Sequence, residues 1–250
     1  MTSTVTDQEA TAGVTAPHVG AATIQRYTAT PNARLGAEGR KYAVEFIGTF
    51  FLMFAVAMAS YSGSVFTPLA AGATLMVMIY AGGHISGGHY NPAVTLAALV
   101  RRRIGIRDAS AYWVVQFGAA LLAAVAVRTI IDPAQRATTT TMTLTSPTML
   151  GAFLGELLFT FALCYVVLNV ATSKDHPKNS FYGLAIGFTV MAGAVAVGTI
   201  SGGAFNPAVT IGAAVMTMFA WHTLWVYLVA QVIAGVAAGA TFLALNPNDK

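Results

Sequence analysis

Charged residues are scarce in this sequence. They make up 9% of its 250 residues, whereas hydrophobic residues make up 56% and the mean hydropathy is +0.67. A soluble domain carries roughly 25% charged residues. The scarcity therefore leaves little room for a soluble domain and predicts a membrane protein that forms one integrated unit.

Cysteine is nearly absent as well, because Cys164 is the only one. A single cysteine excludes an internal disulfide and a cysteine metal cluster. The sequence also lacks a Ser/His/Asp set and a phosphate-binding loop, so we expect no catalytic group, no cofactor and no metal. The net charge of +4 does not indicate nucleic-acid binding, because the basic residues stand in loops between apolar runs.

Apolar runs dominate what is present. The first 40 residues contain none and lack the three-part pattern of a signal peptide, so we predict a disordered cytoplasmic tail over residues 1–40. Six later runs approach the roughly 20 residues that span a bilayer as a helix, and two are too short. The long runs are about Tyr42–Ser60, Phe66–Gly83, Ala109–Ile131, Met149–Ala171, Phe181–Thr199 and Thr223–Leu245; the short ones are about Pro92–Val100 and Pro207–Phe219.

Two short phrases are nearly identical. Residues Ile85–Thr95 read ISGGHYNPAVT and residues Ile200–Thr210 read ISGGAFNPAVT, so only the two residues before the asparagine differ. Asn91 and Asn206 are 115 residues apart (206 − 91), close to half of the chain, which indicates an internal duplication. Asparagine is a preferred N-cap and proline a preferred first helical residue. Each phrase therefore predicts a short helix that begins abruptly inside an apolar region.

The duplication extends beyond the phrases and predicts two repeats, about 41–131 and about 149–245, in a channel domain over 41–245 with a short C-terminal tail at 246–250. Each repeat has the order helix, helix, half-helix, helix. Three spans are an odd number, so the repeats must be inverted relative to each other in the membrane. The matched pairs outside the phrases are Glu45 with Glu156, Tyr112 with Tyr227, and Gln116 with Gln231.

Basic residues indicate the orientation. With the N-terminus in the cytoplasm, 11 of the 13 basic residues are cytoplasmic, as the positive-inside rule requires, and the C-terminus is cytoplasmic too. The run Arg101–Arg107 has two interpretations, a lipid-headgroup or nucleic-acid patch and a topology anchor on a short loop, and we favour the anchor. The two basic residues on the other side of the membrane are Arg128 and Arg136.

Two half-helices near the midplane imply a cavity or pore, because non-helical backbone at membrane depth is tolerated only where it is buried or lines water. Their N-termini carry partial positive charge, and the side chains of Asn91 and Asn206 offer hydrogen-bond donors there. We expect a narrow, electropositive waist that lets neutral molecules exchange hydrogen bonds and opposes cations and protons.

The doubled Asn-Pro-Ala with its Ser-Gly-Gly lead-in resembles the aquaporin (major intrinsic protein) family over about Lys41 to Leu245. The resemblance implies an all-α membrane fold with six transmembrane helices and two re-entrant half-helices, and a homotetramer with one pore in each subunit. It also implies a pore waist formed by Asn91, Pro92, Ala93, Asn206, Pro207 and Ala208.

The same resemblance identifies four outer filter positions, here Ala71, Ala194, Gly203 and Val209. Strict water channels of the family have a large aromatic, a histidine, a small residue and an arginine there. Losing the three larger groups widens and dries the constriction and removes hydrogen-bond donors. We therefore expect a less selective pore for water, hydrogen peroxide, ammonia, urea, short alcohols or dissolved gas.

Four ionisable residues have two interpretations each. Glu45 and Glu156 lie inside apolar runs, where they serve either as a proton relay or as acceptors that support the re-entrant loops. Their matched positions favour loop support. His84 precedes the first phrase and His89 lies within it, and for both we favour loop packing over gating by protonation.

These observations predict a passive, bidirectional channel, not an enzyme, in a lipid bilayer. The short loops favour a microbial plasma membrane. Two alternatives remain open: a proton-coupled secondary transporter, since inverted repeats and broken helices occur there too, and a structural member of the family whose pore is closed.

Overall fold

Helices make up most of the described part of the chain, residues 36–249 of a computed structural model. The predicted tail over residues 1–40 lies outside the described residues as far as residue 35. Helix α1 (Ala37–Tyr61) begins within the last few residues of that predicted tail. Glu38 stands in the first turn, where its negative charge opposes the positive end of the helix dipole, so this polar stretch can join the helix.

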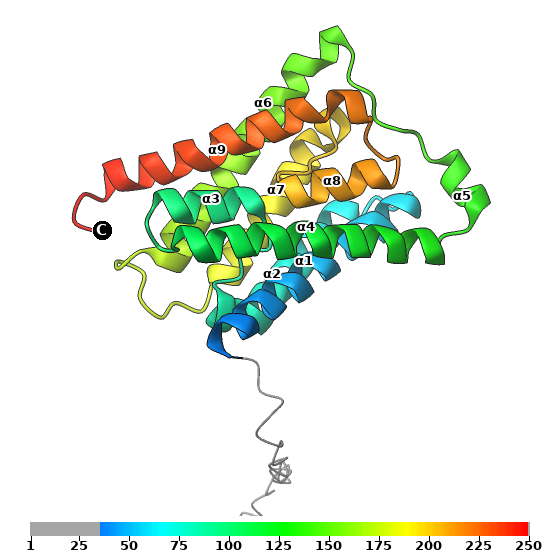
Figure 1. The fold of residues 1–250 in the computed structure, drawn as a ribbon. Coiled ribbons are helices and arrows are strands. Elements are labelled where there is room, and N and C mark those ends of the chain that lie inside the picture. The colour runs from blue at the N-terminus through cyan, green and yellow to red at the C-terminus, as the bar shows by residue number, and fades with distance from the viewer. Residues whose placement is uncertain (1–35, 250) are drawn as a thin grey trace, which may run out of the picture. The chain divides into compact units, whose positions relative to one another are not determined.

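Six helices are long and apolar enough to cross a bilayer, in the order that the sequence predicts, and no strand occurs within residues 36–249 (Figure 1). After α1 they are α2 (Thr67–Ser86), α4 (Ile106–Ile130), α6 (Ser146–Val167), α7 (Tyr182–Ser201) and α9 (Leu224–Leu245). The helix α6 continues into one π-helical segment, η2 (Leu168–Thr172), and a single 3₁₀ turn, η3 (Trp221–Thr223), precedes α9.

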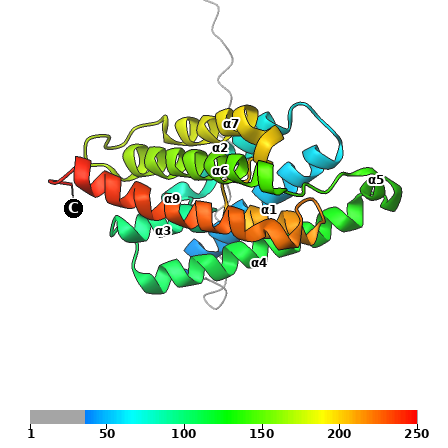
Figure 2. The same ribbon diagram turned by 90° about the horizontal axis from the view of Figure 1, so that it is seen from above.

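The two short runs form the half-helices α3 (Pro92–Val100) and α8 (Pro207–Val215). In Figure 1 they lie roughly end to end, and their N-terminal ends face each other. The corresponding helices α2 and α7 pack against each other. Figure 2 shows the long helices α4, α9 and α6 side by side, with the half-helix α3 between α9 and α4.

The predicted second short run, about Pro207–Phe219, is too long, because α8 ends at Val215. Thr217 has a left-handed backbone (φ 62°), and the chain then leaves the helix. The Met142 N–H donates to the Met218 carbonyl at 2.8 Å, and the Ala220 N–H donates to the Met142 carbonyl at 3.1 Å. The apolar character continues past the helix because Phe219 is buried in this contact with the loop between the repeats.

That loop also contains a helix that the sequence analysis missed, α5 (Pro133–Thr138). Its start signal is present in the sequence. The Asp132 carboxylate accepts a hydrogen bond from the Ala134 N–H at 2.7 Å, and Pro133 occupies the first helical position. A helix this short and polar does not form a long apolar run, so the hydropathy pattern does not indicate it.

The crossing of α2 and α7 depends on two glycines. A Cβ built on Gly72 meets the carbonyl oxygen of Gly187, and a Cβ built on Gly187 meets the carbonyl oxygen of Gly72. The backbones of the two helices therefore touch, as small residues permit in membrane bundles. Because these helices carry the chain into the two repeated phrases, their spacing fixes the spacing of the half-helices.

We predict that Gly187→Ala lowers the apparent unfolding temperature in detergent, because the added methyl group forces α2 and α7 apart at a cost of about 1–3 kcal/mol. Gly118→Ala on α4 is the matched control, since a Cβ there meets no atom within 4 Å. The control should be neutral or slightly stabilising. Equal unfolding temperatures for the two variants would contradict this reading of the crossing.

Candidate functional site

Asn91 and Asn206 cap the two half-helices in the same way. Both have extended backbones, and the side-chain oxygen of each accepts a hydrogen bond from the N–H two residues on, Ala93 at 2.8 Å and Ala208 at 2.9 Å. The proline between each asparagine and its alanine has no N–H, so no backbone donor is left without a partner at that position. The caps fix the oxygen of each amide in its own half-helix and leave the NH₂ group for other contacts.

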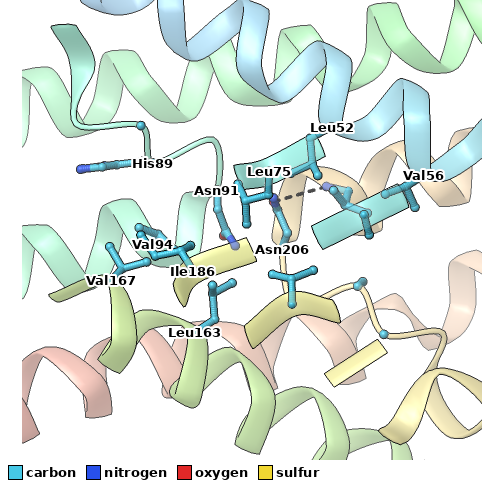
Figure 3. A pocket seen from close by; sticks show the side chains of 16 residues that line it. Leu52, Val56, Leu75, His89, Asn91, Val94, Leu163, Val167, Ile186 and Asn206 are labelled. Atoms are coloured by element: carbon cyan, nitrogen blue, oxygen red, sulfur yellow. Dashed lines mark hydrogen bonds between the residues drawn. The ribbon is translucent and has the colours of Figure 1, made fainter. Parts of the chain in front are cut away.

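The amide nitrogens join the two halves. The Asn91 Nδ2 donates to the Phe205 carbonyl at 2.8 Å, and the Asn206 Nδ2 donates to the Tyr90 carbonyl at 2.9 Å. Each NH₂ group has two hydrogens and uses one in this exchange. Both side chains also line the cavity between the half-helices (Figure 3). One N–H of each asparagine is therefore free to serve a molecule in that cavity.

The carbonyls that accept from the two asparagines belong to residues with an uncommon backbone conformation. Tyr90 and Phe205 have left-handed φ values of 48° and 47°, which bulky side chains rarely adopt. Strain of this kind persists only where the surroundings over-determine it. The two buried glutamates provide those surroundings.

Glu45 accepts four hydrogen bonds from the first loop and its neighbours. One carboxylate oxygen accepts from the Ser86 hydroxyl at 2.7 Å and the His89 N–H at 2.9 Å. The other accepts from the Tyr90 N–H at 2.7 Å and the Gln116 Nε2 at 2.9 Å. The side chain is fully buried.

Glu156 repeats this arrangement in the second half. It accepts from the Ser201 hydroxyl at 2.8 Å, the Ala204 N–H at 2.9 Å, the Phe205 N–H at 2.8 Å and the Gln231 Nε2 at 2.9 Å. Neither glutamate lines the cavity that contains the asparagines. Two backbone N–H groups per loop are therefore satisfied at membrane depth by an acceptor that faces away from the passage.

The cavity between the half-helices, called here the narrow cavity, has a volume of about 30 Å³. A water molecule needs at least roughly 10–15 Å³ measured in this way, so the space holds about two in a row. Three of its 16 lining residues have polar side chains, namely His89, Asn91 and Asn206, and Figure 3 shows apolar side chains around them.

A wider cavity opens at each end of the narrow one. The threonine vestibule, of about 560 Å³, is lined by Thr67, Thr139, Thr140 and Thr199 among others. The basic vestibule, of about 480 Å³, is lined by Lys41, Arg103 and Lys174 among others. The narrow cavity shares lining residues with both, so the three spaces form one line through the bundle.

All four predicted filter residues line the threonine vestibule, and Ala71, Gly203 and Val209 also line the narrow cavity. Ala194 lines only the vestibule. The sequence analysis missed Val56 and Ala204, which line both spaces. For Ala204 a signal was present, because it is one of the two residues at which the repeated phrases differ.

The two histidines considered for loop packing or gating lie in different places. His84 is exposed and lines neither the narrow cavity nor a vestibule. His89, the counterpart of Ala204, lines the narrow cavity and the basic vestibule. Its Nδ1 lies 3.1 Å from the Thr95 hydroxyl, whose hydrogen goes to the Asn91 carbonyl. One ring nitrogen of a neutral His89 donates and the other accepts, so the imidazole adds a polar group to the cavity beside the two asparagines.

We predict that Glu156→Gln destabilises the second loop. Glutamine has one acceptor oxygen, so two of the four donors lose their partner, at about 1–3 kcal/mol for each buried group left unpaired. The unfolding temperature should fall, and hydrogen exchange at the Phe205 amide should rise. Glu38→Gln, at an exposed carboxylate that pairs with Arg107 at 3.6 Å, is the control. Similar behaviour of the two variants would argue against loop support.

Comparisons with known proteins agree with this geometry. The family model described as Major intrinsic protein matches residues 33–242. The chain is 39% identical over 217 residues to a glycerol uptake facilitator protein-like 6 from Lactiplantibacillus plantarum, covering 84% of this chain and all of that protein. It is 33% identical over 219 residues to nodulin-26 from Glycine max, covering 84% and 76%.

A solved structure, the aquaglyceroporin from Plasmodium falciparum, has the same fold with a TM-score of 0.71 at 23% sequence identity, covering 82% of this chain and 95% of that one. The six apolar helices, the family match and the two relatives lead to one assignment. The chain is an integral membrane protein that belongs to the major intrinsic protein family, whose members are channels and not enzymes.

Proposed function

We propose that this protein is a passive, bidirectional channel for water and small uncharged solutes, with one pore in each subunit. The observation that carries the proposal is the line of three cavities. Val56, Ala71, Gly203, Ala204 and Val209 are common to the threonine vestibule and the narrow cavity. His89 and Val167 are common to the narrow cavity and the basic vestibule.

Ions meet a barrier in this line. No carboxylate lines the narrow cavity within the described chain, so an entering cation loses its water without gaining a counter-charge. The positive ends of α3 and α8 both face the asparagines, which opposes cations and protons further. A neutral molecule meets two amide N–H donors and the imidazole of His89, and it can exchange hydrogen bonds with them.

The filter gives this pore a broad selectivity. Ala71, Ala194, Gly203 and Val209 present no side-chain donor or charge, and Val209 stands where strict water channels have arginine. A solute that leaves water there without a hydrogen-bond partner loses on the order of 1–3 kcal/mol. Short alcohols, ammonia and hydrogen peroxide lose few such partners, and the wider filter also admits the more strongly hydrated urea, so we include all four with water as permeants.

The two alternatives receive less support. A proton relay through the two glutamates receives no support, because Glu45 and Glu156 are filled with donors and lie off the path, which leaves His89 as the titratable side chain that lines the narrow cavity within the described residues. A closed member of the family would have to keep the narrow cavity dry, but Asn91, Asn206 and His89 offer water polar partners there. Osmotic swelling no faster than in protein-free liposomes would favour the closed alternative.

We also propose a setting for the channel. The basic vestibule opens to the cytoplasm, because Lys41, Arg103 and Lys174 line it and basic residues are retained on that side. Both termini are then cytoplasmic, in a plasma membrane. Apolar side chains exposed on the outside of the bundle, among them Phe51, Val114 and Leu158, face lipid and the neighbouring subunits of a homotetramer.

We predict that Val209→Arg turns the pore towards water selectivity. The guanidinium narrows the junction and restores donors and charge, so urea flux into proteoliposomes should fall at least about tenfold while water flux remains. Val209→Ala, which changes width without adding polarity, should keep both fluxes. If urea flux is absent in the wild type and unchanged in Val209→Arg, the wide-pore account is wrong.

A further inference from the structure

The two half-helices end in turns with the same backbone and different side chains. The Arg102 N–H donates to the Leu99 carbonyl, and the Thr217 N–H donates to the Ala214 carbonyl, both at 3.0 Å. Arg102 and Thr217 have left-handed φ values of 66° and 62°. The turn is thus one device used twice, and its side chains can be compared position by position.

Arg101 is the position at which the two turns differ most in chemistry, because it buries a charge where the second turn buries an apolar side chain. It is 1% exposed, and its counterpart 115 residues later, Met216, is 2% exposed. Likewise, Arg103 corresponds to Met218. An apolar side chain fills the buried position in the second half, so the turn itself does not require a guanidinium. A topology anchor does not require burial either, since exposed arginines serve that purpose.

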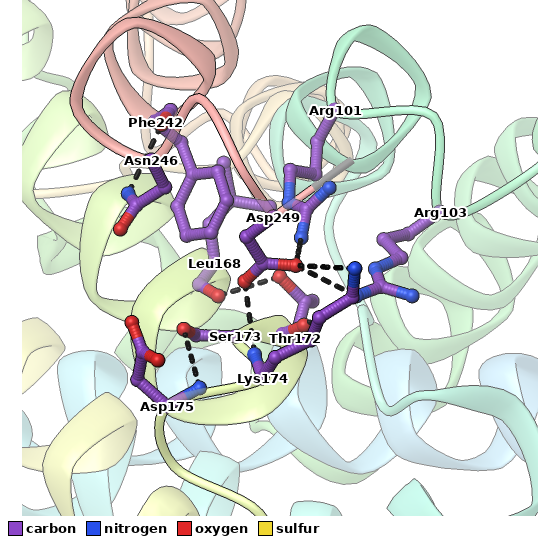
Figure 4. A network of polar contacts seen from close by, with 10 residues as sticks. All are labelled: Arg101, Arg103, Leu168, Thr172, Ser173, Lys174, Asp175, Phe242, Asn246 and Asp249. Atoms are coloured by element: carbon purple, nitrogen blue, oxygen red, sulfur yellow. Dashed lines mark hydrogen bonds and ion pairs between the residues drawn. The ribbon is translucent and has the colours of Figure 1, made fainter.

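The partner of Arg101 comes from the end of the chain. The Asp249 carboxylate accepts from Arg101 Nη2 at 2.7 Å and Arg103 Nη2 at 3.2 Å with one oxygen, and from the Lys174 N–H at 2.9 Å with the other (Figure 4). The Arg101 guanidinium also lies 4.2 Å from the centre of the Phe242 ring. These contacts join the first half-helix, the loop after η2 and the residues after α9.

An ion pair is not required to fill this space. Arg101 uses one nitrogen on the carboxylate, and its Nε and Nη1 are buried without a hydrogen-bond partner among residues 36–249. Replacing a buried ion pair by apolar residues is often neutral or stabilising, and the second repeat has the apolar solution. Pro247 and Asn248, which lead to Asp249, are exposed. A buried charge on an exposed tether is suited to a contact that forms and breaks.

The contact holds a wall of the basic vestibule. Thr172, Ser173 and Lys174 line that vestibule, and Arg103 lines it too. Besides its contact with Asp249, Arg103 Nη2 donates to the Thr172 carbonyl at 2.9 Å. Asp249 therefore holds the wall directly, through the Lys174 N–H, and indirectly, through Arg103.

We propose that Asp249 is a latch that holds the wall Thr172–Lys174 in place and so keeps the basic mouth of the pore open. The flux part of this proposal rests on the proposed channel function. With the latch closed, the vestibule measures about 480 Å³ and the narrow cavity about 30 Å³, so the vestibule does not limit flux. A wall that moves can therefore lower the flux but cannot raise it.

The first measurement is hydrogen exchange at the Lys174 amide in lipid discs. Asp249→Ala removes its acceptor, and exchange should rise at least about tenfold, as for the loss of a hydrogen bond to a charged group. Because this variant leaves Arg101 buried without a counter-charge, Arg101→Met/Asp249→Ala is the second variant, which copies Met216. Glu38→Gln, which removes an exposed carboxylate, should leave the exchange unchanged. Unchanged exchange in both latch variants would overturn the proposal.

The second measurement is water and urea flux of the same variants in proteoliposomes. Flux should fall several-fold in Arg101→Met/Asp249→Ala, equally for both solutes, because the wall and not the filter has changed. Faster exchange with unaltered flux would overturn the latch as a control of the mouth. A wild type that conducts neither solute would instead overturn the proposed function, and the exchange measurement keeps the two failures apart.

The latch should hold throughout the neutral range. Burial opposes the charge of Asp249, but the Lys174 N–H and the Arg101 guanidinium hold the pKa of its carboxyl below the ordinary value. Within residues 36–249 the charged groups paired with it are the cations Arg101, Arg103 and Lys174, and Asp175 lines the same surface pocket as Asp249. The stabilisation is present above the ordinary pKa and is lost as pH falls through the lower folded value. Protection of the Lys174 amide, corrected for intrinsic exchange, should be constant from about pH 5 to pH 8.

Discussion

Backbone that is not helical has to find hydrogen-bond partners inside a membrane, and two buried carboxylates meet this demand. Glu45 and Glu156 each accept two backbone N–H groups from a re-entrant loop, together with one serine and one glutamine. The loops can then place Tyr90 and Phe205 in left-handed conformations, and the carbonyls of these residues bind the asparagine of the opposite half. The waist of the passage depends on this support.

The inverted repeat makes the waist symmetrical and leaves the two ends free to differ. At the waist, each bond of one half has a counterpart of similar length in the other. Away from the waist the corresponding positions differ. His89 in the first repeat corresponds to Ala204 in the second, and Arg101 corresponds to Met216. The basic end thus has an imidazole and a cluster of charges, whereas the other end has small apolar filter residues and threonines. Selectivity and control can reside at separate ends of one duplicated scaffold.

Structural features that depend on neighbouring residues could be predicted from the sequence. Features that depend on contacts between distant segments could not. Six apolar runs and two Asn-Pro-Ala phrases predict the helices and half-helices, because length and capping are local. The end of α8 depends instead on pairing with Met142 across the structure. Val56 lies in an unmarked apolar helix, and the burial of Asp249 depends on arginines about 150 residues earlier, so no local signal identifies either role.

The central claim is that Asn91 and Asn206 each keep one amide N–H for molecules that pass between the half-helices. The most direct test is an electron cryomicroscopy map of the protein in lipid discs, at a resolution that reveals ordered water. The account predicts a file of water peaks through the narrow cavity, with peaks within hydrogen-bond distance of both amide nitrogens. A cavity filled by side chains, or amides separated from each other and turned to lipid, would contradict it.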